Sequence, residues 1–379
     1  MPREKTKLAF IFYNMGLGGI QRKIVDLINY IYQNGLSEKI EPYLLYTAEA
    51  DFDFLNQLDP EFKQLIRPKA WKIFKKTFYF PSFIQWGINI LKFDINLVLS
   101  HVLHSSIRSV FLSKLFFWKK IEVFISQDNI FSYENPRFYQ KVLGKIFYPA
   151  AKAIIVQNQV AKQDLIDYLN ISADKIFVVP NWVVTNFKNT KKNSKSKAKK
   201  ADKKIFDLLF IGRFAPQKNL LTLIKVVKEL KKNKKDISLL MVGEGKEEQS
   251  LKKYVKSNKL VKNVRFAKPN RDVASFYAQS KIFVLSSKYE GQPVVLLEAW
   301  STALPAVVMN YPGLKLYFHN QEAGLIAYSI KDMSDKIILL LKNNSLRKKL
   351  GLIGQRRVKK DYNVTNLEKY FEILGLCLN

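Results

Sequence analysis

The sequence contains very little cysteine and histidine. Its 379 residues include one cysteine, Cys377, and three histidines. A single cysteine excludes a disulfide framework and a zinc site built on several thiolates. The longest uncharged stretches, 77–91 and 299–314, are both interrupted by proline and glycine, and both are shorter than the roughly 18–20 apolar residues of a membrane-spanning helix. No apolar signal segment follows the first residues, so we expect a cytoplasmic protein.

Acidic residues are also scarce. Lys and Arg number 63 against 32 Asp and Glu, which gives a formal net charge of +31. Residues 188–204 contain nine lysines and one aspartate, a composition typical of a solvated, self-repelling linker. A contact of this tract with nucleic acid or lipid is the alternative. A hydrophobic content of 47% excludes general disorder, and the length suits two domains.

Short apolar runs alternate with helix-like segments in both halves of the chain. The runs that we predict as strands are 8–13, 97–99, 122–125, 154–156, 177–179, 207–211, 238–242, 264–266, 282–285 and 306–309. This alternation predicts an α/β protein with two doubly wound parallel sheets and helices on both faces. We place the domains at 1–187 and 205–360, joined by the linker, and predict a helix in 361–379 that packs back on the first domain. Ligands are expected between the domains, at the carboxyl ends of the strands.

Two glutamates, Glu290 and Glu298, flank a predicted strand-to-helix turn. A buried strand precedes Glu290, and a helix is expected to begin near Val294 and to carry Glu298 about two turns in. Gly291 permits a close approach of a ligand to the backbone, and free amides at a helix start hold anions. The alternative is one surface glutamate and one capping glutamate.

Two further features point to a bound phosphate. Gly18 and Gly19 lie between the first predicted strand and its helix, where the backbone can approach a phosphate. Arg213 and Lys218 follow the first strand of the second half, where two permanent cations neutralise a diphosphate. The alternatives are a structural turn and a solvated pair of charges.

These features occur together with Val178-Val-Pro-Asn181 and Val242-Gly-Glu-Gly245 in one fixed order along the chain. In this order they resemble glycosyltransferase family 4, the retaining sugar transferases with two facing Rossmann-like domains, the GT-B fold. The resemblance covers nearly the whole chain. It implies a nucleotide-sugar donor, with a UDP-sugar favoured, and neither a metal ion nor a cofactor.

The resemblance also implies roles for individual residues. Arg213 and Lys218 hold the donor diphosphate, Glu298 binds the ribose, and Glu290 faces the transferred sugar. The backbone of Gly291, Pro293, Val294 and Val295 meets the phosphate. His101, at the end of a predicted strand, is the active-site histidine that binds a sugar hydroxyl; His104 is the competing candidate, and His319 is taken as a surface residue. The route is departure of the nucleoside diphosphate with attack on the same face, with a covalent route through Glu290 as the alternative.

Four positions bear on this assignment. Ala303 stands where the family usually has glycine, and Trp182 where a small residue is commoner, so both reshape loops near the expected site. Asp51 and Asp53 form an Asp-x-Asp pattern of the kind found in metal-dependent transferases. They lie in a turn-like acidic stretch before Pro60, and we predict no strand beside them that would support a metal site, so we favour a solvated loop.

A basic and aromatic segment, residues 67–81, lies in the first half. It contains Lys69, Trp71, Lys72, Phe74, Lys75 and Lys76, a composition that suits docking on anionic lipid headgroups. We therefore expect a lipid-linked saccharide or polysaccharide precursor as acceptor, and a peripheral location on the inner face of the cell membrane. A core helix with a solvated basic face is the alternative for this segment.

Two other function classes fit the composition less well. A nucleic-acid-binding protein would explain the positive charge, but the sequence has no recognised nucleic-acid-binding motif. A non-catalytic scaffold on a transferase-like fold would have no reason to keep Arg213, Lys218, Glu290 and Glu298 together.

Overall fold

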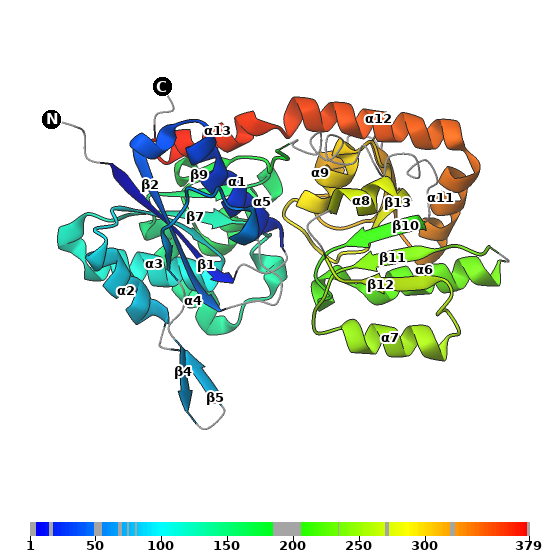
Figure 1. The fold of residues 1–379 in the computed structure, drawn as a ribbon, viewed down its shortest axis with the longest axis horizontal. Coiled ribbons are helices and arrows are strands. Elements are labelled where there is room, and N and C mark those ends of the chain that lie inside the picture. The colour runs from blue at the N-terminus through cyan, green and yellow to red at the C-terminus, as the bar shows by residue number, and fades with distance from the viewer. Residues whose placement is uncertain are drawn as a thin grey trace. The chain divides into compact units, whose positions relative to one another are not determined.

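The computed structural model describes residues 5–14, 18–48, 55–66, 70–73, 76–79, 82–184, 206–233, 235–269, 273–318 and 323–376. The lysine-rich tract 188–204, Asp51, Asp53 and His319 lie outside these residues. Two compact units emerge, Met1–Pro180 with Leu367–Asn379, and Asn181–Asn366. Each is a parallel sheet with helices (Figure 1), so the predicted α/β fold class is confirmed. The first segment of the first unit ends at Pro180, before our predicted boundary at residue 187.

The first unit contains a seven-stranded sheet in the order β3-β2-β1-β6-β7-β8-β9. Its strands are β1 (Thr6–Asn14), β2 (Ile40–Ala48), β3 (Leu65–Ile66), β6 (Leu97–His101), β7 (Glu122–Gln127), β8 (Ala153–Val156) and β9 (Ile176–Val178). Central β1 has four consecutive residues, 8–11, with no exposed surface. A continuous buried run is what a parallel strand covered on both faces requires.

Helices cover both faces of this sheet. They are α1 (Gly19–Gln33), α2 (Ser82–Lys92), α3 (Leu103–Leu115), α4 (Phe138–Phe147), α5 (Gln159–Leu169) and α13 (Val364–Ile373). Figure 1 shows α1 and α13 on the side opposite α2 and α3. The last helix packs on α1, where Tyr30 stacks on Phe371 with ring centroids 5.6 Å apart and donates a hydrogen bond of 2.9 Å to Glu368.

The second unit contains a six-stranded sheet in the order β12-β11-β10-β13-β14-β15. Its strands are β10 (Phe206–Ile211), β11 (Leu239–Val242), β12 (Val264–Ala267), β13 (Ser280–Leu285), β14 (Ala306–Met309) and β15 (Gly324–Ala327). Its helices are α6 (Leu220–Lys232), α7 (Glu248–Ser257), α8 (Val273–Ala278), α9 (Val294–Ser301), α10 (Lys315–Phe318), α11 (Ile330–Lys342) and α12 (Asn344–Asp361). One apolar cluster joins this sheet to its helices and includes the wholly buried Trp300.

All ten predicted strands are present, within one or two residues at each end. The sequence did not reveal β2, β3 or β15. The basic segment 67–81 contains an antiparallel pair, β4 (Ala70–Ile73) and β5 (Lys76–Tyr79), that joins neither main sheet, so the alternative of a core helix is wrong. Among the described helices, none has both the length and the apolar character to cross a membrane.

Candidate functional site

Two loops of the second unit meet where neighbouring parallel strands end. β10 pairs with β13, and β10 is followed by a short 3₁₀ turn, η9 (Pro216–Lys218). The Lys218 Nζ lies 2.5 Å from Glu290 Oε1, beyond the end of β13. The backbone N–H of Lys288 donates to the carbonyl of Gln217 at 2.9 Å and ties the two loops together. The fold thus brings together Lys218 and Glu290, two residues predicted for the site.

Glu290 is held by several donors at once. Besides Lys218, the hydroxyl of Ser287 donates to Oε1 at 2.6 Å, and the Gln217 amide lies 3.4 Å from Oε2. The residue is only 5% exposed, so this carboxylate is buried but paired and hydrogen-bonded, as a stable buried charge must be. Its orientation is fixed before any ligand arrives.

Glycines allow the loops after β10 and β11 to pack closely. Gly243 has φ +154° and Gly245 φ +147°, backbone conformations that side-chain-bearing residues rarely adopt. A Cβ on Gly243 would lie 2.0 Å from the Gly212 carbonyl oxygen, and one on Gly245 would lie 2.5 Å from that of Phe214. Arg213, between these contacts, is exposed, and its guanidinium group forms no hydrogen bond or ion pair with other described residues.

The helix start after Glu290 lies where the sequence predicts it. α9 begins at Val294, with Pro293 as N-cap and Gly291 buried just before it. The first backbone N–H groups of a helix have no acceptor within the helix, and the positive end of the helix dipole favours an anion there. Val294 and Val295 carry such groups.

Glu298 lies closer to the helix start than predicted. It is the fifth residue of α9, little more than one turn in, rather than two turns. The hydroxyl of Tyr277 donates to Glu298 Oε2 at 2.8 Å. The side chain is partly exposed, so its carboxylate is oriented by Tyr277 while remaining accessible.

A second polar pair lies beside this helix start. Asn181 donates its backbone N–H to Gln292 Oε1 at 2.5 Å and its amide to the Gln292 carbonyl at 2.8 Å. Gln292 Nε2 and Asn181 Oδ1 are buried and have no partner among the described residues. Buried polar atoms without partners are unusual and require an explanation. Trp182, next to Asn181, is buried.

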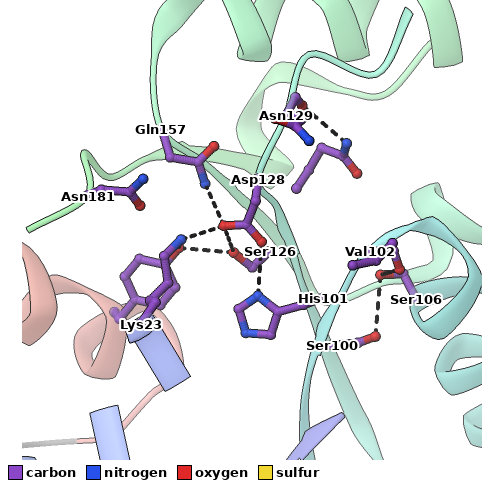
Figure 2. A network of polar contacts seen from close by, with 12 residues as sticks. Lys23, Ser100, His101, Val102, Ser106, Ser126, Asp128, Asn129, Gln157 and Asn181 are labelled. Carbon is purple, nitrogen blue, oxygen red and sulfur yellow. Dashed lines mark hydrogen bonds and ion pairs between the residues drawn. The ribbon is translucent and has the colours of Figure 1, made fainter. Parts of the chain in front are cut away.

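The first unit has its own polar cluster at the carboxyl ends of β6, β7 and β8 (Figure 2). Asp128, directly after β7, lies at its centre. Its Oδ1 is 2.5 Å from Lys23 Nζ, and its Oδ2 is 3.0 Å from His101 Nδ1. Ser126 and Gln157 each donate to Oδ1 at 3.2 Å.

Burial and the neighbouring charged groups together set the charge states of this cluster. His101 is fully buried and Lys23 is 3% exposed. Burial lowers the pKa of His101, and the nearby Asp128 opposes this only in part. Burial alone would raise the pKa of Asp128, but Lys23 and the hydrogen bond from His101 outweigh it and leave the pKa well below normal. His101 is therefore neutral at pH 7, beside an ionised Asp128 and a charged Lys23.

These charge states determine the tautomer of His101. The carboxylate only accepts hydrogen bonds, so Nδ1 carries the proton and donates to Asp128. Nε2 then bears a lone pair, and it is buried with no partner among the described residues. The next residue, Val102, has φ +70°, a strained value for a β-branched side chain. Strain beside an unpartnered imidazole nitrogen indicates a ligand site.

Sequence reasoning singled out His101 but missed its partners. Asp128 could have been found, because it directly follows a predicted strand, as His101 ends one. Lys23 lies on the helical stripe that carries Ile24, and only its burial distinguishes it from a surface lysine. It also lies 3.1 Å from the Tyr370 hydroxyl of α13, a contact over 347 positions that no local pattern reveals.

The remaining predicted residues are placed as follows. Gly18 is the N-cap of α1 and Gly19 its first residue. His104 is exposed in α3, with Nε2 3.0 Å from the Gln140 amide. The backbones of Trp71, Lys72 and Lys76 lie in β4 and β5, whereas Lys69, Phe74 and Lys75 fall outside the described residues. Among described side chains, no group of three or more His, Cys, Asp or Glu is arranged to hold a metal ion.

Comparison with known proteins finds similarity to glycosyltransferases. The family model of the glycosyl transferases group 1 matches residues 189–357, a range that includes Lys218, Glu290 and Glu298. An uncharacterized glycosyltransferase of Haemophilus influenzae is 31% identical over 163 residues, which are 42% of this chain and 46% of that protein. The UDP-Gal:alpha-D-GlcNAc-diphosphoundecaprenol alpha-1,3-galactosyltransferase of Escherichia coli is 29% identical over 55% of each chain. The alignments thus span about half the length of these relatives.

The similarity in fold extends further than the similarity in sequence. HepE of Anabaena, crystallised with UDP and glucose, superimposes with a TM-score of 0.77 over 98% of this chain and 100% of its own, at 14% identity. In residues 189–357 the chain is therefore similar in sequence to the glycosyl transferases of group 1, and its fold is that of the GT-B glycosyltransferases.

Proposed function

We propose that the protein is a retaining glycosyltransferase of family 4 that moves a sugar from a nucleotide-sugar donor, with a UDP-sugar favoured, to a lipid-linked saccharide or polysaccharide precursor. The observation that carries this proposal is the Lys218–Glu290 pair beside the start of α9. It joins a cation, an oriented carboxylate and free helix amides at the carboxyl ends of parallel strands, where ligands bind in such sheets.

In this proposal the second unit binds the donor. The amides at the start of α9 and the ammonium of Lys218 bind the diphosphate, and exposed Arg213 adds a second cation. Glu298, oriented by Tyr277, accepts hydrogen bonds from the ribose. Negative charge grows on the diphosphate as the sugar leaves, so fixed cations stabilise the transition state more than the bound donor.

The contacts of Glu290 favour departure of the diphosphate with same-face attack over a covalent intermediate. Its carboxylate oxygens already accept from Lys218, Ser287 and Gln217. A nucleophile needs a free lone pair directed at the sugar carbon, and these donors compete for it. Glu290 instead positions the Lys218 ammonium and accepts from a hydroxyl of the transferred sugar.

His101 binds a sugar hydroxyl in the first unit. With the proton on Nδ1, its Nε2 accepts a hydrogen bond and does not donate one. Asp128 and Lys23 act as positioning residues, because they fix the tautomer and the ring orientation without reaching the substrate themselves. His104, exposed and bonded to Gln140, lacks such a partner carboxylate among the described residues.

The acceptor assignment is supported by the Escherichia coli relative, whose name describes transfer from UDP-Gal to a diphosphoundecaprenol-linked sugar. A UDP donor is also supported by the UDP crystallised with HepE. We propose the cytoplasmic face of the membrane as the site of action, with no metal ion or cofactor required. The basic strands β4 and β5 are one proposed contact with anionic lipid.

Ligand binding and transfer test this function separately. Thermal shift with UDP, GDP and their sugars should show stabilisation of the full chain by uridine nucleotides, because a ligand that binds only the folded state raises the melting temperature. Lys218→Ala and Glu290→Ala should each lower transfer at least about a hundredfold, by analogy with the loss of one oxyanion-site donor.

The matched control is Lys281→Ala. Lys281 forms an ion pair of 2.8 Å with Asp207 at the amino ends of the same two strands, away from the proposed site. The Lys281→Ala variant should bind nucleotides and transfer sugar at near wild-type levels. No stabilisation by any nucleotide sugar, or near-normal turnover of Lys218→Ala, would overturn the proposal. Retention on DNA without nucleotide binding would favour the nucleic-acid alternative.

A further inference from the structure

Exposed large apolar side chains are concentrated on one part of the first unit. Of the twenty in the described residues, twelve lie on α2, α3, the short 3₁₀ turn η3 (Phe117–Lys119) and α4. The other eight are scattered over the rest of the described chain. Single exposed apolar residues are ordinary, whereas a concentration of them marks an interaction surface. We name residues 82–92, 103–120 and 137–147 the α2–α4 face.

The elements of this face are packed against one another. A Cβ on Gly87 of α2 would lie 3.2 Å from Leu112 of α3 and 3.3 Å from Phe116. Phe111 of α3 meets Phe147 of α4 edge to face, with ring centroids 6.3 Å apart. The exposed residues on α2 and α4 therefore belong to one continuous layer.

The exposed apolar residues follow helical spacing on the outer side of their helices. In α4, Phe138, Val142 and Ile146 are each four residues apart and all exposed, and Phe138 is 82% exposed. Residues at this spacing share one side of a helix. Phe117 and Trp118 of η3, just after α3, are 76% and 59% exposed. The sheet is covered by other side chains of α2 and α3, so this outer stripe is not needed for the core.

The charge of the face is almost entirely positive. Residues 82–92, 103–120 and 137–147 contain eight Lys and Arg and no acidic residue, and Asp94, just outside the face, is paired with Lys119. Lys114, Lys120 and Lys145 are exposed among the apolar residues. Aromatic and aliphatic side chains mixed with lysine are typical of an element that lies in the headgroup region of an anionic bilayer.

We propose that the α2–α4 face docks on an anionic lipid bilayer. A second copy of the chain fits less well, because two such faces in contact would bring like charges together. A nucleic acid would leave twelve apolar side chains without a function. The inference deepens the proposed function, on which it rests for the membrane-linked acceptor. α3 begins two residues after His101, and the 3.0 Å contact of Gln140 with His104 places the first turn of α4 beside it, so a bilayer on this face lies near the proposed acceptor site.

Co-sedimentation of the full chain with vesicles tests this without sugar transfer. Vesicles of phosphatidylcholine with phosphatidylglycerol should bind the protein, vesicles of phosphatidylcholine alone should bind it weakly, and salt should weaken binding. The combined variant Phe117→Ser, Trp118→Ser and Phe138→Ser should lower the partition coefficient at least about tenfold, since buried apolar area drives interfacial binding. Lys114→Glu, Lys120→Glu and Lys145→Glu together should do the same for anionic vesicles.

Two control variants test whether vesicle binding is specific to this face. Val261→Ser, Leu339→Ser and Leu352→Ser remove exposed apolar residues of the second unit and should leave binding unchanged. Lys72→Glu with Lys76→Glu alters the basic strands β4 and β5, and should weaken binding less than the face variants. UDP-induced thermal shift of each variant should stay at the wild-type value, so that loss of docking is distinguished from loss of donor binding.

Two results would overturn the proposal. One is wild-type vesicle binding by both combined face variants. The other is a wild-type dimer that the serine variant converts to a monomer in analytical ultracentrifugation while vesicle binding persists, which would assign the face to a second copy.

Discussion

Asp128→Asn removes the negative charge at the centre of the first unit's polar cluster. Lys23 then remains 3% exposed without the carboxylate that lies 2.5 Å from its ammonium. Removing one partner of a buried ion pair costs about 3–5 kcal/mol, since it leaves an uncompensated buried charge. The asparagine carbonyl can still accept from Lys23, so we expect the lower end of this range. For a unit of this size the melting temperature should fall by roughly 6–12 °C.

A double-mutant cycle with Lys23→Met identifies the cause of this loss. Met has no charge to bury, so Lys23→Met with Asp128→Asn should be clearly more stable than the sum of the two single losses predicts. Hydrogen exchange measured on peptides from β6, β7 and β8 reports the stability of the first unit separately from that of the second. Sugar transfer should stay low in the double variant, because a neutral amide in place of the Asp128 carboxylate no longer fixes the His101 tautomer.

The control for this cycle is Asp94→Asn, the same substitution in the exposed pair with Lys119, which should leave the exchange pattern unchanged. The assigned ion pair would be refuted if the two single substitutions lowered the free energy of unfolding additively. It would also be refuted if Asp128→Asn changed that free energy by less than about 1 kcal/mol.

Two further predictions concern stability. Ala303 has φ +58° just after α9, so Ala303→Gly should stabilise the second unit by about 1 kcal/mol in urea unfolding; a less stable variant would contradict this. Burial lowers the pKa of His101, so below about pH 6.5 this histidine is protonated in the unfolded chain but stays neutral in the folded chain. The free energy of unfolding should therefore decrease as the pH is lowered. His101→Gln should reduce this slope relative to wild type, and equal slopes would contradict the assigned neutral state.

The strands were predictable because parallel strands covered on both faces need continuous apolar runs. β1, β6 and β13 each contain such a run, and their observed ends lie within two residues of the predicted ones. β2 was missed because Glu41 and Pro42 interrupt its apolar pattern near the start. The strand pair β4 and β5 was not foreseen, since a basic aromatic segment fits a helix, a ribbon or a loop equally well.

The Lys218–Glu290 contact shows which part of the site the sequence pattern could predict and which part it could not. Sequence reasoning placed both residues after apolar strands, but it offered no reason why these two strands, far apart in the chain, should be neighbours. Pairing of β10 with β13 makes them neighbours. The same pairing brings Gln217 to Glu290, a contact that was not predicted. Ala303 departs from the family that the sequence resembles, and its positive φ supplies the physical reason for the usual glycine there.

The sequence alone determined the α/β class, the positions of most strands along the chain and the side chains that we propose for donor binding, because these depend on local periodicity and residue chemistry. Only the tertiary structure decided which charges are buried together. Lys23, Asp128 and Tyr370 come from three distant segments, and their charge states depend on exclusion of water. The outward apolar face of α2 to α4 likewise depends on which side of each helix the sheet covers.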